Sequence, residues 1–145
     1  MEPTFSHFGI CVSDLEASVR FYCEALGFTR AERHQIGREF APLMELPDVE
    51  VTSQFLRRES VAMELLAFGT PSPSGDRQRR AINQLGLTHL SFRVDDIETA
   101  AARVVECGGT VVEPSRTVID FAGTPLTFLY CTDPDGVRVE LMDLG

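Results

Sequence analysis

Apolar and polar residues alternate twice along the chain in the same way. After His7 the apolar positions are Phe8, Ile10 and Val12, and after His89 they are Leu90, Phe92 and Val94. An alternation with period two is typical of a strand that buries one face. Both segments are therefore predicted to be strands, with the histidine on the face opposite the apolar side chains.

These two strands begin a longer internal repeat. Identical residues fall in register when the segment from His7 to Thr29 is placed over the segment from His89 to Val111, among them His7 with His89, Val12 with Val94, Asp14 with Asp96, Glu16 with Glu98 and Gly27 with Gly109. The period is far longer than that of a solenoid repeat. It indicates a duplicated supersecondary unit.

A helix is predicted after each strand. Ser13 with Glu16, and Asp95 with Glu98, stand at the spacing of a capping box, which closes the N-terminus of a helix. Apolar residues then follow at helical spacing: Leu15, Val19, Tyr22 and Leu26 in the first copy, and Ile97, Ala101, Val104 and Val105 in the second. Gly27 and the pair Gly108–Gly109 are expected to end the helices.

Three further strands are expected in each copy, so that each copy is a βαβββ unit. The expected ranges are 28–35, 50–57 and 61–68 in the first copy, and 110–113, 125–131 and 137–143 in the second. The segment Asp133-Pro134-Asp135-Gly136 predicts a tight turn between the last two strands. The stretch 70–76, rich in Pro, Ser and Gly, is typical of a linker, and the chain is expected to consist of module 1–80 and module 81–145.

The net charge of −9 argues against nucleic acid and anionic membranes as partners, because both attract basic surfaces. No stretch approaches the roughly 20 apolar residues that cross a bilayer. The N-terminal sequence MEPTFSHFGI lacks the basic region and apolar run of a signal peptide, so we expect a cytoplasmic protein. The cysteines lack the spacing of a zinc ribbon and are expected to be buried thiols: Cys11, Cys23, Cys107 and Cys131.

Each unit carries one histidine on its first strand and one glutamate on its last. His7 is matched in this way with Glu64, and His89 with Glu140. Strand parity places all four side chains on the face away from the helix, so they would converge if the two sheets curl toward each other. A buried carboxylate or imidazole without a partner is costly, and a shared cation satisfies both. We therefore predict one divalent metal ion (Zn, Ni, Co, Mn or Fe(II)) held by these four residues.

Two polar residues are candidates for contact with a small-molecule substrate. Gln54 lies on the strand next to Glu64 and would orient a substrate oxygen if it faces the same side; otherwise it is an exposed strand residue. Arg93 shares the face of His89 and would either pair with Glu140 or bind an anion.

Aromatic residues are weaker candidates. Phe55 and Phe128 would line an apolar substrate pocket, although core packing explains either residue equally well. Asp14, Asp95 and Asp96 are interpreted as helix caps rather than catalytic groups.

The motifs that carry these features resemble the vicinal oxygen chelate superfamily, which includes glyoxalase I, methylmalonyl-CoA epimerase, extradiol dioxygenases and bleomycin-resistance proteins. They are H-F-G-I-C-V-S-D-L-E-A-S-V-R-F-Y, G-L-T-H-L-S-F-R-V-D-D-I and D-P-D-G-V-R-V-E-L. The resemblance implies an α+β fold in which two paired βαβββ modules form an open, cup-shaped mixed sheet in a single domain, 1–145. It also implies that His7, Glu64, His89 and Glu140 fall on the metal-ligand positions, and that the protein is a homodimer.

Within this family, the acidic residue Glu64 at the fourth ligand position favours the glyoxalase and epimerase branch. We therefore expect a metal-dependent isomerase or lyase that abstracts a proton next to a carbonyl through a metal-bound enediolate, with Glu140 or Glu64 as the base. Two alternatives stay open at this point: an Fe(II) extradiol-type dioxygenase, and an antibiotic-sequestering binding protein.

Overall fold

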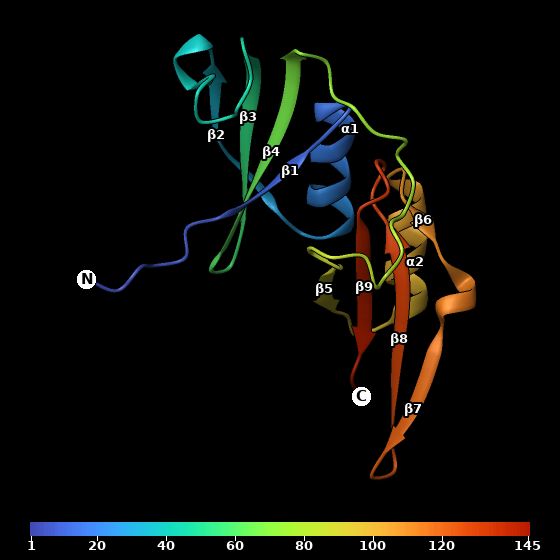
Figure 1. Cartoon of the computed structure of the whole chain (residues 1–145). Coiled ribbons are helices and arrows are strands. Elements are labelled where there is room, and N and C mark those ends of the chain that lie inside the picture. Colours follow the sequence, from blue (N-terminus) through green and yellow to red (C-terminus); the bar gives the residue numbers. More distant parts are fainter. The chain divides into compact units, whose positions relative to one another are not determined.

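A strand, a helix and a run of antiparallel strands occur twice along the chain (Figure 1). The computed structural model describes all 145 residues. It divides into unit 1, Met1–Cys23 with Gly27–Gly75, and unit 2, Glu24–Leu26 with Asp76–Gly145. The boundary after Gly75 falls within the Pro-, Ser- and Gly-rich stretch 70–76. Each unit has a mixed sheet and few helices, which confirms the α+β class.

The sheet of unit 1 has the strand order β1-β4-β3-β2. Strand β1 (Phe8–Cys11) runs parallel to β4 (Val61–Thr70), while β3 (Glu50–Arg58) pairs antiparallel with β4 and with β2 (Thr29–Ile36). The apolar positions of the sheet and the helix α1 (Leu15–Arg20), which continues as a π-helical turn over Phe21–Ala25, form the core. Its fully buried side chains include Val12, Val19, Tyr22, Leu56, Met63 and Leu65.

Unit 2 repeats this order of strands. Strand β5 (Leu90–Arg93) runs parallel to β9 (Arg138–Asp143), β9 pairs with β8 (Thr124–Thr132), and β8 pairs with the short β6 (Thr110–Val111). The helix α2 (Ile97–Glu106) buries Ile97, Ala101 and Val104 against this sheet, as its periodicity predicted. Val105 was expected on the same face but is exposed, because the buried stripe of this helix is narrower than the run of apolar residues.

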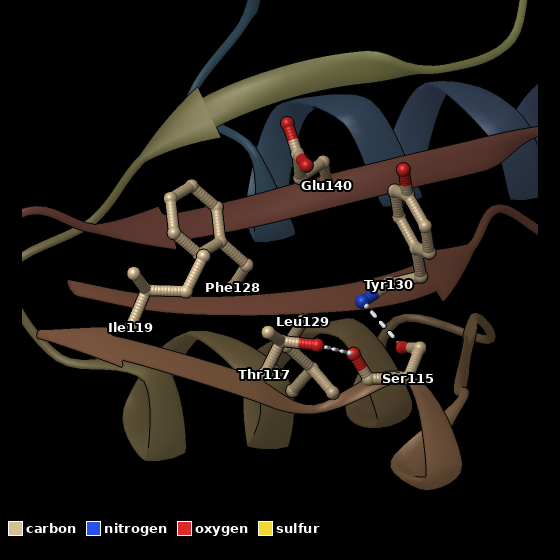
Figure 2. A pocket seen from close by; sticks show the side chains of 7 residues that line it. All are labelled: Ser115, Thr117, Ile119, Phe128, Leu129, Tyr130 and Glu140. Carbon is tan, nitrogen blue, oxygen red and sulfur yellow. Dashed lines mark hydrogen bonds between the residues drawn. The ribbon is translucent and has the colours of Figure 1, made fainter.

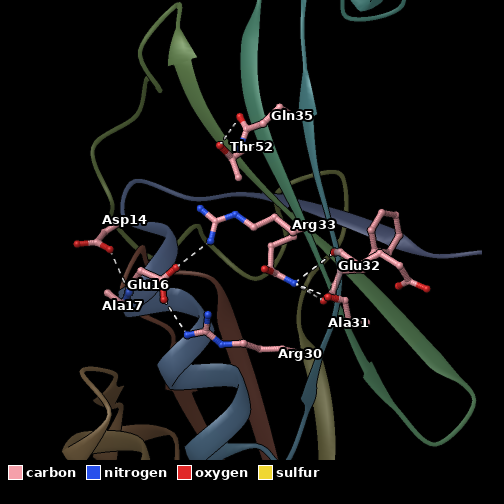
Figure 3. A network of polar contacts seen from close by, with 11 residues as sticks. Asp14, Glu16, Ala17, Arg30, Ala31, Glu32, Arg33, Gln35 and Thr52 are labelled. Carbon is pink, nitrogen blue, oxygen red and sulfur yellow. Dashed lines mark hydrogen bonds and ion pairs between the residues drawn. The ribbon is translucent and has the colours of Figure 1, made fainter.

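The two helix caps are each one residue later than the capping-box spacing suggested. Asp14 accepts the backbone N–H of Ala17 at 3.0 Å, and Asp96 accepts that of Glu98 at 2.9 Å. The interpretation of Asp14 and Asp96 as helix caps is confirmed, whereas Ser13 and Asp95 are not the caps. Glu16 does not reach back to the helix start; its carboxylate pairs with Arg30 at 2.7 Å and with Arg33 at 3.4 Å across the surface of unit 1 (Figure 3).

One strand of unit 2 was missed by the sequence analysis. Strand β7 (Thr117–Phe121) pairs antiparallel with β8 and forms an edge of the sheet, whereas β6 has two residues where four were expected. All five residues of β7 are exposed, so the strand lacks the buried face that produces a readable alternation. No helix has the length and apolar composition needed to cross a membrane.

The predicted turn between β8 and β9 is confirmed. Gly136 donates its N–H to the carbonyl of Asp133 at 3.2 Å and has a φ of 88°, a conformation that favours glycine. The buried carboxylate of Asp133 also accepts the N–H groups of Asp135 at 2.9 Å and of Val137 at 2.8 Å. This side chain thus supplies the hydrogen bonds that fix the entry into β9.

Replacing Asp133 with Ala is expected to lower the free energy of unfolding by about 2–4 kcal/mol, because two backbone N–H groups lose their acceptor. Asp133→Asn keeps an acceptor oxygen in place and should lose less than about 1 kcal/mol. Urea unfolding at a common m value measures both. Equal stability of the two variants would contradict this role for Asp133.

Candidate functional site

His7 and Glu64 meet on one face of the sheet in unit 1. Glu64 on β4 lies opposite Gly9 on β1, two residues after the histidine. The Nε2 atom of His7 is 3.3 Å from Oε2 of Glu64, and the two side chains are 35% and 16% exposed. A nitrogen donor and a carboxylate therefore face each other at a partly buried position.

His89 and Glu140 form the same arrangement in unit 2. Glu140 on β9 lies opposite Ser91 on β5, again two residues after the histidine. The Nε2 atom of His89 is 3.3 Å from Oε2 of Glu140, with exposed fractions of 29% and 16%. The duplication of the sequence has therefore produced two pairs with matching geometry.

A hydroxyl group orients each imidazole ring. Oγ of Ser6 is 2.9 Å from Nδ1 of His7, and Oγ1 of Thr88 is 2.9 Å from Nδ1 of His89. A hydrogen bond at Nδ1 leaves Nε2 as the ring atom that is turned toward the glutamate. In the sequence this contact is indicated by a hydroxyl residue directly before each histidine.

An aromatic ring lies beside each pair. Phe55 on β3 is opposite Glu64, and its ring centroid is 5.0 Å from that of His7. Tyr130 on β8 is opposite Glu140, and its ring centroid is 5.7 Å from that of His89. The structure thus brings Phe55, a candidate from the sequence, to the first pair, and reveals Tyr130 as its counterpart.

The two carboxylates are held in different ways. Ser53 on β3 donates to Oε1 of Glu64 at 2.5 Å, so that both oxygens of Glu64 have a partner when the histidine at Oε2 is included. Ser91 donates to Oε2 of Glu140 at 2.7 Å, which is also the oxygen nearest His89. Oε1 of Glu140 therefore remains without a hydrogen bond from the protein.

Arg138 fixes the segment that precedes β5 in unit 2. Its guanidinium is buried, donates to the carbonyl of Arg80 at 2.7 Å and to that of Thr88 at 3.4 Å, and lies 5.1 Å from the ring centroid of Tyr130. Both Thr88 and Tyr130 contact His89. Arg138 thereby stabilises the surroundings of this histidine, a role that the sequence did not indicate.

The donors of each pair fit a shared divalent cation. Two ligands about 2.1 Å from a tetrahedral ion lie roughly 3.4 Å apart, close to the 3.3 Å that separates nitrogen and oxygen in each pair. Imidazole nitrogen and carboxylate oxygen are suitable ligands for Zn, Fe(II), Co, Ni and Mn. The structure brings these ligands together in pairs. It contains no group of three or more His, Cys, Asp or Glu side chains arranged to hold a metal ion.

Gln54 does not share the face of Glu64, contrary to one interpretation of the sequence. It lies opposite Leu65 on the core side of the sheet and is 3% exposed. Its amide nitrogen is within 3.3 Å of three backbone carbonyl oxygens, those of Phe55 and of Ala31 and Glu32 at the β2 irregularity. The side chain stabilises the backbone there and is not turned toward a substrate.

Arg93 on β5 and Phe128 on β8 lie in unit 2, on either side of Met142, which follows Glu140 by two residues on β9. Arg93 shares the face of Ser91 and His89, is exposed and forms no ion pair with Glu140. The expected contact with Glu140 is therefore wrong, and anion binding by Arg93 stays a prediction. Phe128 lies beside Glu140 in a hollow of about 250 Å³ (Figure 2).

The cysteines are thiols and not disulfides. Cys107 and Cys131 are buried as expected, whereas Cys11 is exposed on the face that carries His7. Burial raises the pKa of the Cys131 thiol to about 11, so this group is protonated and unreactive near neutral pH.

Comparison with known proteins gives one consistent result. The model of the Glyoxalase/Bleomycin resistance protein/Dioxygenase superfamily matches residues 4–141. The Cereibacter sphaeroides ethylmalonyl-CoA/methylmalonyl-CoA epimerase is 31% identical over 138 residues, covering 94% of each chain. The Escherichia coli (strain K12) protein YaeR is 30% identical over 141 residues, covering 94% of this chain and 93% of its own. A glyoxalase family protein from Bacillus cereus shares the fold with a TM-score of 0.81 at 21% identity, over 97% of this chain and 94% of that one.

Replacing Gln54 with Leu is expected to lower the free energy of unfolding by about 1–3 kcal/mol, because buried carbonyl groups lose their donor. The exposed Gln35 on the adjacent strand is a matched control, and Gln35→Leu should change stability by less than about 0.5 kcal/mol. Thermal or urea unfolding measures both. An unchanged stability of Gln54→Leu would overturn the structural role assigned to this side chain.

Proposed function

Because the chain belongs to the glyoxalase/bleomycin resistance protein/dioxygenase superfamily, we propose that it is a metal-dependent enzyme that removes a proton from the carbon next to a substrate carbonyl. This is the chemistry of the glyoxalase I and epimerase type, and makes the protein an isomerase or a lyase. The observation that carries the proposal is the pair of matching His–Glu contacts, each at 3.3 Å.

In this proposal His7, Glu64, His89 and Glu140 are the four ligands of one divalent ion. Each unit supplies an imidazole whose Nδ1 is bonded to a hydroxyl oxygen and whose Nε2 faces a carboxylate. Such hydrogen bonds at the far side of a ligand fix its tautomer and ring orientation. A bound divalent ion would supply Lewis-acid stabilisation of the negative charge that develops on the substrate oxygens.

Glu140 is the better candidate for the general base. Its Oε1 has no hydrogen bond from the protein, whereas Oε2 is held by Ser91 and lies near His89. A proton acceptor needs an unoccupied oxygen within reach of the substrate carbon. Glu64 lacks such an oxygen because Ser53 and His7 contact both of its carboxylate oxygens. We therefore assign the proton transfer to Oε1 of Glu140 and a purely ligating role to Glu64.

The similarity to an epimerase agrees with a reaction of the glyoxalase I and epimerase type, and the Bacillus cereus structure shows that the fold is shared. Abstraction of a proton next to a carbonyl is the step common to both activities. Which product forms depends on where the proton is returned, and this choice is open in the proposal. A homodimer in the cytoplasm remains our expectation for the assembly and its location.

Replacing Glu140 with Gln is expected to slow proton exchange at the carbon next to the carbonyl by about 10²–10⁴-fold, because the acceptor of the proton is lost. The measurement is NMR in D₂O with zinc-, nickel- or cobalt-loaded protein and two probes, methylmalonyl-CoA and the hemithioacetal of methylglyoxal. Glu106→Gln removes an exposed carboxylate from α2 and should exchange as the unmodified protein does.

Three outcomes would count against the proposal. If the Glu140→Gln variant exchanged the substrate proton at the rate of the unmodified protein, Glu140 would not be the base. Oxygen uptake by iron-loaded protein with catechols, without proton exchange on any probe, would favour a dioxygenase. Tight binding of an aromatic antibiotic that survives His89→Ala, again without exchange, would favour a sequestering protein.

A further inference from the structure

The surroundings of the two glutamates differ at two corresponding positions. In unit 1, Gly9 lies opposite Glu64 and Ser53 lies two residues before the aromatic Phe55. In unit 2, Ser91 lies opposite Glu140, and Phe128 lies two residues before Tyr130. The hydroxyl that donates to the carboxylate is thus on β3 in unit 1 and on β5 in unit 2. In unit 2 the position that corresponds to Ser53 is occupied by the large apolar ring of Phe128.

A hollow lies beside Glu140, where Phe128 replaces the serine of unit 1. Its volume is about 250 Å³, and it is lined by Ser115, Thr117, Ile119, Phe128, Leu129, Tyr130 and Glu140. Phe128, Tyr130 and Glu140 stand on the side of the sheet away from α2, with Ile119 on β7 next to Phe128 (Figure 2). Thr117 is the strand partner of Phe128, so β7 forms the outer wall.

The hydroxyl groups of Ser115 and Thr117 are engaged with the backbone. Oγ of Ser115 donates to the carbonyl of Val112 at 2.7 Å and accepts the N–H of Tyr130 at 2.9 Å. Oγ1 of Thr117 donates to the carbonyl of Ser115 at 3.0 Å. What the lining offers to a ligand is therefore the apolar surface of Ile119 and Phe128 and the ring of Tyr130 with its hydroxyl, with the carboxylate of Glu140 at one end.

We infer that this hollow binds an uncharged apolar substituent of the substrate, an aryl or branched alkyl group carried next to the reacting carbonyl. The lining contains no Arg or His, and its one ionisable carboxylate would repel an anionic substituent. Burial of an apolar group against Phe128 and Ile119 is favourable by contrast. This inference rests on the proposed function, because it places the reacting carbon beside Glu140.

The size of the hollow limits the substituent. Pockets for drug-sized ligands measure roughly 300–1,000 Å³, and this one measures about 250 Å³. A single ring or a short branched chain fits within this volume. Any larger part of the substrate must extend away from β7 and β8.

Binding of hydroxamates to zinc-loaded protein tests the inference by calorimetry. Acetohydroxamate and benzohydroxamate offer a metal the same two neighbouring oxygens and differ in the apolar group. Benzohydroxamate is expected to bind at least about 10-fold more tightly, because its ring is buried in the hollow. The ring of 4-carboxybenzohydroxamate carries a negative charge and should lose this advantage.

Two variants of β7 locate the effect. Ile119 is 51% exposed and Val118 is 63% exposed, so a polar residue is tolerated at both positions, which alternate between the faces of the strand. Ile119→Asp should reduce the preference for benzohydroxamate to less than about 3-fold, while Val118→Asp should leave it unchanged. Ile119→Arg should restore binding of 4-carboxybenzohydroxamate.

The results distinguish this inference from the proposed function. Equal affinities for acetohydroxamate and benzohydroxamate, or the same loss in Val118→Asp as in Ile119→Asp, would overturn the apolar subsite and leave metal-dependent chemistry standing. Failure of the zinc-loaded protein to bind any hydroxamate would overturn the proposed function itself.

Discussion

The parallel pairing of the first and last strands in each unit sets each histidine against its glutamate. β1 pairs with β4, and β5 with β9, in a register that sets the glutamate opposite the residue two positions after the histidine. The helix covers the other face, so the polar pair remains on the side that is free of core packing. Shifting either register by one residue would turn the glutamate into the core. Conservation of this pairing through the duplication explains why both pairs have the same separation.

The duplication also allowed the two pairs to diverge. In unit 1, Ser53 and His7 contact both oxygens of Glu64, which suits a group that only binds a metal. In unit 2 the hydroxyl donor to the glutamate is Ser91 on β5, and Oε1 of Glu140 has no hydrogen bond from the protein. Phe128 lines the hollow beside this glutamate. In the proposed function, a symmetric ligand set would thereby serve an asymmetric reaction, in which both units bind the metal and unit 2 also receives the substrate.

Strand parity and the internal repeat predicted the βαβββ units, every strand except β7, and both His–Glu pairs, because these features depend on the periodicity that one buried face imposes. Parity was not applied to Gln54, which lies on the core side of β3 and bonds to the backbone. The edge strand β7 was missed because it has no buried face. The ring of Tyr130 and the guanidinium of Arg138 were missed because their contacts depend on packing between strands, which local sequence does not encode.

The most direct test of the central claim is the number of metal ions bound per chain. Metal analysis and calorimetric titration with zinc should give one ion per chain, and His7→Ala and His89→Ala should each weaken binding severely, because each unit supplies half of the ligands. Two ions per chain, with one retained in each variant, would show two separate sites and contradict a shared centre. A protein that binds no metal after reconstitution with zinc, nickel, cobalt and iron would contradict the account altogether.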